Sequence, residues 1–169
     1  MIRRRVLLSG AGLWFMMAIS CTPSRPPVLI ADTDFRRWDR NEPAYIFFTP
    51  PDTFSKTDLF LVLRCTDSYG FDGLRLSVET QAPSGTFWRD TVTLSCREEN
   101  EGEVAVSGTA SKDYRFPYLQ NVKFGQPGTY RFRFAHLMPD SLLAGIAGIG
   151  IEFQSTSHGK RQTQTVSGE

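Results

Sequence analysis

Cys21 is the residue whose surroundings most directly predict a chemical reaction. It follows Ala18, Ile19 and Ser20 at the end of an apolar segment. A cysteine after small residues at this place is typical of a bacterial lipobox, in which the thiol receives a diacylglycerol before the leader is cleaved. Ala18 stands where leucine is more usual. We therefore predict that Cys21 is the lipid-attachment residue.

Residues 1–20 have the charge order of an export signal. Three arginines at positions 3–5 precede an uncharged apolar stretch over residues 6–19, as in signal peptides. The alternative is an uncleaved anchor, because the uncharged residues 6–24 just reach the length of a membrane span. The paired arginines leave open general or twin-arginine export. Residues 21–27 then form a stiff, proline-containing tether.

Cys65 and Cys96 fall on the inward side of two predicted strands. Exported proteins can form disulfides, and Trp88 lies between the two cysteines in sequence, as a tryptophan does in immunoglobulin cores. Strand parity alone does not bring two Cα atoms within bonding reach. A disulfide is therefore one interpretation, and a pair of buried free thiols is the one we favour.

His136 is the histidine with neighbours suited to catalysis. Asp140 and Ser141 follow it closely in sequence, but a catalytic triad is defined by geometry, and no Gly-x-Ser-x-Gly elbow is present. We expect a structural histidine. One histidine in the body of the chain, without clustered carboxylates or thiols, argues against a zinc site.

Five aromatic residues are candidates for a contact surface that stacks on sugars: Trp38, Tyr69, Trp88, Tyr114 and Tyr118. The alternative is that these rings fill the core or plug loops. The glycines at 145–150 lack the lysine and the following helix of a nucleotide loop. We expect no catalytic residues, no metal, no other cofactor and no small-molecule substrate.

The body of the chain has the patterning of short strands. Six segments alternate or run apolar as strands do: residues 44–49, 58–66, 74–78, 92–96, 130–134 and 149–153. Residues 28–35 and 103–106 are weaker candidates, and glycine and proline turns separate most of the strands. The best helix candidate is short, over residues 139–144.

These segments predict an all-β fold, an antiparallel β-sandwich of about eight strands, immunoglobulin-like or jelly-roll-like, with no substantial helix. The sandwich would occupy residues 28–153. Residues 97–127 are the least regular part, and we expect them to form a long excursion over the sheets. The polar residues 154–169 are expected to be a disordered tail.

Size and charge limit the class of protein. The chain has 169 residues with 19 basic and 18 acidic side chains. Because residues 1–20 contain three of the basic residues and none of the acidic ones, the 149-residue mature chain has a formal charge of −2. This balance argues against a nucleic-acid binder. A hydrophobic fraction of 40% with 13 Phe excludes a wholly disordered chain.

The order of features along the chain resembles one known family. After the lipobox come Phe35, Trp38, Leu59-x-Leu61-x-Leu63-Arg64, Tyr69, Leu74-x-Leu76, Asn121-Val122-Lys123-Phe124, Pro127-Gly128-Thr129-Tyr130-x-Phe132, and His136-x-Met138-x-x-x-Leu142-x-x-Ile146-x-x-Ile149-Gly150. This pattern is similar to the GldH gliding-motility lipoproteins of Bacteroidota over residues 21–153, most specifically over 121–151. Residues 102–108 lack the tryptophan usual there, and Pro139 replaces an arginine.

The resemblance implies a non-enzymatic lipoprotein that is tied to the gliding machinery or to its associated protein-secretion system. Only Cys21 carries over as a functional residue. No acidic run follows Cys21, which in these bacteria favours the periplasmic face of the outer membrane over the cell surface. The expected partners are the membrane, through the lipid, and envelope proteins. The alternative function is a lipid-anchored glycan-binding module.

Overall fold

The structure, a computed structural model, describes residues 26–96, 103–107 and 111–156. This part of the chain folds into eleven β-strands without a helix. It therefore contains no helix that is long and apolar enough to cross a bilayer. The prediction of an all-β antiparallel sandwich is confirmed.

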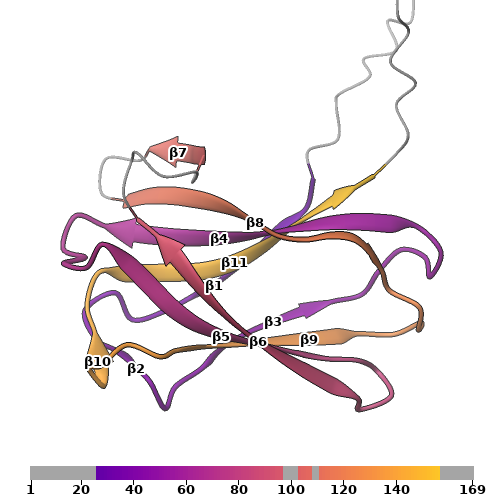
Figure 1. The fold of residues 1–169 in the computed structure, drawn as a ribbon, viewed down its shortest axis with the longest axis horizontal. Coiled ribbons are helices and arrows are strands. Elements are labelled where there is room, and N and C mark those ends of the chain that lie inside the picture. The colour runs from indigo at the N-terminus through magenta and orange to yellow at the C-terminus, as the bar shows by residue number, and fades with distance from the viewer. Residues whose placement is uncertain (1–25, 97–102, 108–110, 157–169) are drawn as a thin grey trace, which may run out of the picture.

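Two antiparallel sheets lie one above the other (Figure 1). The larger sheet has five strands in the order β1 (Val28–Asp32), β11 (Ile146–Ser155), β4 (Lys56–Thr66), β8 (Ser111–Lys123) and β7 (Glu103–Ser107). The smaller has four, in the order β3 (Ala44–Phe48), β9 (Tyr130–His136), β5 (Gly73–Gln81) and β6 (Phe87–Ser95). A two-residue pair, β2 (Trp38–Asp39) with β10 (Leu142–Leu143), accompanies them.

The period-two pattern of the central strands builds the core. On β4, the alternate residues Leu59, Leu61, Leu63 and Cys65 are all buried. Inward residues of β5, β9 and β11 meet them from both sheets, and the fully buried ones include Leu74, Leu76, Phe132, Phe134, Ile149 and Ile151. Because successive side chains of a strand point to opposite faces, the intervening residues form the outer surface.

The described part of residues 97–127 differs from the prediction of an irregular excursion. Thirteen of them, Ser111–Lys123, form β8, which pairs along β4. Two register shifts interrupt this pairing on either side of Leu59, opposite the segment from Pro117 to Val122. Asn121 has a positive φ of 56°. These irregularities break the alternation of apolar and polar residues, so the strand is hidden from a period-two reading.

The short helix expected at residues 139–144 is wrong. Leu142 and Leu143 form β10 instead. One guanidinium nitrogen of Arg40 donates to the backbone carbonyls of Met138, Pro139 and Asp140, at 2.8 Å for Pro139. These carbonyls are the acceptors that a helix would need for its own ladder, and Arg40 holds them in an open turn.

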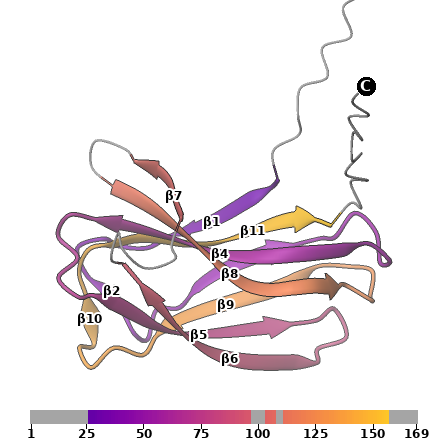
Figure 2. The same cartoon turned by 45° about the horizontal axis from the view of Figure 1, so that its top comes forward.

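The first and last described residues lie side by side at one end of the sandwich (Figure 2). Phe153 N donates to Pro27 O at 3.0 Å, and Thr156 N donates to Lys56 O at 3.0 Å. β11 therefore continues through Ser155, two residues beyond the predicted end of the domain. We call this end, where Pro27 and Ser155 lie, the tether end.

Candidate functional site

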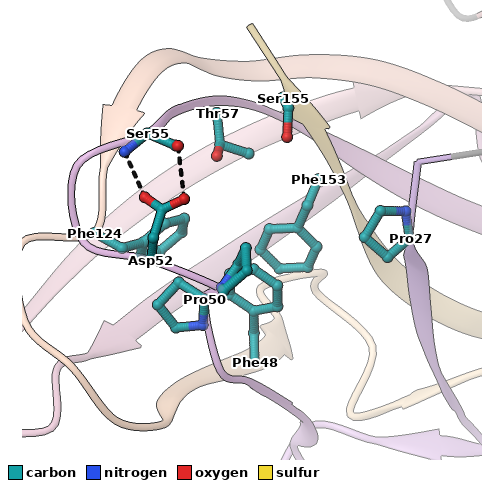
Figure 3. Close-up of a pocket in the computed structure, with 10 residues that line it drawn as sticks. Pro27, Phe48, Pro50, Asp52, Ser55, Thr57, Phe124, Phe153 and Ser155 are labelled. Carbon is teal, nitrogen blue, oxygen red and sulfur yellow. Dashed lines mark hydrogen bonds between the residues drawn. The ribbon is translucent and has the colours of Figure 1, made fainter. Parts of the chain in front are cut away.

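A small aromatic pocket opens at the tether end. Its volume is about 180 Å³. The lining residues come from β3, β4, β11 and the connecting loops: Pro27, Phe48, Pro50, Pro51, Asp52, Ser55, Thr57, Phe124, Phe153 and Ser155. Figure 3 shows the phenylalanine rings gathered between Pro27 and the loop that carries Asp52. The rings of Phe48 and Phe153 stack with centroids 3.7 Å apart, which makes the pocket floor apolar.

The polar side chains of this pocket form hydrogen bonds within the loop that carries them. The Asp52 carboxylate accepts hydrogen bonds from Ser55 N at 2.6 Å and from Ser55 Oγ at 2.7 Å. The bond from the Ser55 backbone, followed by that from its hydroxyl, holds the pKa of Asp52 below its ordinary value. An Asp that closes a turn in this way fixes the loop. Phe54, between them, is 74% exposed, so this end presents an apolar contact surface.

Cys65 and Cys96 are brought together from different sheets. Both are free thiols, and their Sγ atoms are 3.8 Å apart. Cys65 lies on β4, and Cys96 directly follows β6. The hydrogen bond from the Cys65 thiol lowers the pKa of Cys96, while that bond and burial raise the pKa of Cys65. Cys96 is therefore the better nucleophile of the pair, since the thiolate is the reactive form.

We expect the Cys65–Cys96 pair to oxidise in an oxidising compartment, joining the two sheets. Closing a loop across 31 residues of sequence separation is expected to stabilise the domain by about 3 to 4 kcal/mol. Alkylation with mass spectrometry should show two protected cysteines, and dithiothreitol should lower the melting temperature. A Cys65→Ser/Cys96→Ser variant should melt with the reduced protein and ignore the reductant. Full alkylation after oxidative refolding would contradict this expectation.

His136 is a buried structural residue. Its side chain has no exposed surface, and its ring lies against Trp38 with centroids 5.1 Å apart. His136 Nε2 is 3.2 Å from Trp38 O; since a carbonyl only accepts, this nitrogen carries the hydrogen. Burial lowers the pKa of His136 below its ordinary value. The imidazole is therefore neutral and enclosed, whereas Asp140 and Ser141 are exposed.

The five aromatic candidates do not share one face. Trp38 and Tyr114 are buried, at 2% and 5% exposure, so neither can stack on a sugar. Tyr69 and Tyr118 are half-buried, and their hydroxyls donate to Gly73 O and to Asp90 at 2.8 and 2.6 Å. Trp88 is 40% exposed at an edge of the smaller sheet. Sequence parity did not reveal which of these rings close the core.

The remaining predictions concern the lipid-attachment residue and a metal site. Cys21 and most of the tether lie outside the described residues. Over the described ranges, no group of three or more His, Cys, Asp or Glu side chains is placed to hold a metal ion.

The described residues form a small β-sandwich with apolar and charged surfaces. Residues 30–153 match the family described as GldH lipoprotein. The chain belongs to the GldH lipoprotein family. This is not known as an enzyme family, and its lipoprotein character indicates a membrane-anchored location in the cell envelope.

Other comparisons are distant. No curated protein matches the chain. Among solved structures, dimeric latent PorU from Porphyromonas gingivalis aligns with a TM-score of 0.34 and 15% identity. The alignment covers 78% of this chain, which spans 13% of the PorU chain.

Proposed function

We propose that this protein is a non-enzymatic, lipid-anchored accessory component of the gliding machinery or of its associated protein-secretion system. It would be held through Cys21 at the periplasmic face of the outer membrane. Membership in the GldH lipoprotein family is the observation that carries this proposal. The folded domain supports it, because both ends of the described chain lie at the tether end and the two outer sheet faces are left for partners.

Confinement to a membrane strengthens such a role. A lipid and a short tether keep the domain near other envelope proteins and raise its effective concentration against them. A modest contact surface is then enough to keep a partner protein bound. The tether-end pocket, which is lined by Pro27, lies where the tether enters the domain.

In-cell crosslinking of a tagged protein tests the proposal. We expect mass spectrometry to recover gliding or secretion subunits at about tenfold higher yield than from a control that carries residues 1–27 on an unrelated domain. The control has the same anchor, so the difference reports the β-sandwich. Equal recovery from both proteins, or capture of glycan-uptake proteins instead, would contradict the proposed role.

A further inference from the structure

The outer face of the four-stranded sheet carries a surplus of positive charge. Its outward positions on β5, β6 and β9 include four arginines: Arg75, Arg89, Arg131 and Arg133. Glu79 is the one acidic residue at an outward position of the four strands. Four arginines against one glutamate give this face a formal charge of +3, although the chain after residue 20 carries −2.

Strand register arranges these side chains in two rows across the sheet. The first row is Tyr45, Arg133, Glu79 and Arg89, and the second is Phe47, Arg131, Gln81 and Phe87. Directly opposed residues of antiparallel strands have Cβ atoms about 5 Å apart, so each row is continuous across all four strands. We call this surface, formed by the two rows and Arg75, the arginine face.

Arginines on the opposite face of the sandwich are paired with carboxylates. On the five-stranded sheet, Arg64 pairs with Asp113 at 2.8 Å and Arg115 pairs with Glu152 at 2.9 Å. On the arginine face, Glu79 pairs with Arg89 at 2.6 Å. Within the described ranges, Arg75, Arg131 and Arg133 have no carboxylate within ion-pair distance.

Exposed rings flank the unpaired guanidinium groups. Tyr45, Phe47 and Phe87 are 43%, 63% and 61% exposed on the two edge strands. Arg131 lies over the ring of Tyr45 at 5.8 Å. Arginine and aromatic residues are enriched in protein interfaces, and a guanidinium binds a carboxylate through two parallel hydrogen bonds. The chemistry therefore fits an acidic protein surface with apolar patches at its margins.

The orientation of the face argues against a bilayer as its partner. The strand next to the tether, β1, belongs to the five-stranded sheet. The arginine face is the far side of the other layer (Figure 1). It therefore points away from the layer to which the tether is joined.

We infer that the arginine face docks an acidic surface of a partner protein. Complementary charge would steer the encounter and fix its orientation, while the rings supply buried area. This inference rests on the proposed function, in which the protein binds other envelope proteins. It adds which surface makes the contact and that the partner's surface is acidic.

Site-specific photocrosslinking in cells tests this inference. A photoreactive residue replaces Thr91, which is exposed on β6 within the arginine face, and in a second strain it replaces Gln120, which is exposed on β8 of the opposite sheet. We expect a discrete protein adduct from position 91 whose crosslinked peptide is rich in Asp and Glu. The charge reversal Arg131→Glu/Arg133→Glu should lower its yield about tenfold or more.

Matched variants separate charge at this face from net charge. Arg36→Glu/Arg37→Glu makes the same change in an exposed loop and should leave the adduct intact. Arg131→Gln/Arg133→Gln serves if reversal beside Glu79 impairs folding. No adduct, an adduct with carbohydrate, or a yield that ignores the reversal would overturn the inference. An acidic partner outside the gliding and secretion machinery would support the face and contradict the proposed function.

Discussion

Gly145→Ala is expected to destabilise the domain by about 3 kcal/mol or more, enough to unfold a marginal protein. Gly145 has a φ of +91°, and a Cβ atom there would overlap the backbone N and Cα of Tyr69. The backbone cannot move aside easily. Gly145 N donates to Phe35 O at 2.7 Å, and Gly145 O accepts from Thr66 N at 2.8 Å. Chemical denaturation of purified protein measures the loss.

Gly85→Ala is the matched control for this prediction. Gly85 has nearly the same φ, +88°, but a Cβ atom there would meet nothing within 4 Å. It should cost only the backbone strain, about 1 kcal/mol. The difference between the two variants then measures the close approach to Tyr69. Equal losses would show that strain alone sets the requirement for glycine at position 145.

Local alternation was enough to predict the fold class. Residues 58–66 and 130–134 repeat apolar side chains with period two, and their inward residues are buried as expected. The buried face of such a strand can be predicted from its sequence, because successive side chains point to opposite sides of the sheet. The fold class therefore followed from the central strands.

Contacts between distant segments could not be found in this way. The close approach of Gly145 to Tyr69 and the capping of residues 138–140 by Arg40 join segments far apart in sequence. The bulged pairing of β8 also depends on β4, and Pro117 in its middle reads locally as a break. These features depend on tertiary geometry that period and composition do not encode.

For the surfaces too, strand parity predicted part of the arrangement and the packed structure supplied the rest. Strand parity placed Arg131 and Arg133 on the outer side of β9, and this was the available signal for the arginine face. Only the structure shows that neither arginine forms an ion pair, because Glu79, which lies opposite Arg133, binds Arg89 instead. Parity likewise put Cys65 inside, but only the packed sheets bring its sulfur 3.8 Å from that of Cys96.

Cys21→Ala, made in a chain whose residues 1–20 are replaced by a signal peptide that is cleaved without lipidation, is expected to move the protein from the membrane fraction to the soluble fraction of the cell envelope. Without the thiol no diacylglycerol can be attached, and burial of each lipid CH₂ contributes about 0.8 kcal/mol to membrane binding. Loss of the chains therefore removes the attachment almost entirely. Fractionation with immunoblotting measures the change, and the intact mass of the wild-type protein should show a lipidated chain that begins at residue 21.

Cys65→Ser provides the control, because it removes a thiol of the domain and leaves the lipobox intact. This variant should remain with the membrane. If the wild-type protein keeps residues 1–20 and its mass shows no lipid, the uncleaved anchor over residues 6–24 is the correct interpretation. If the Cys21→Ala protein is released from the membrane yet supports full activity of the machinery, lipid confinement is not required for partner binding.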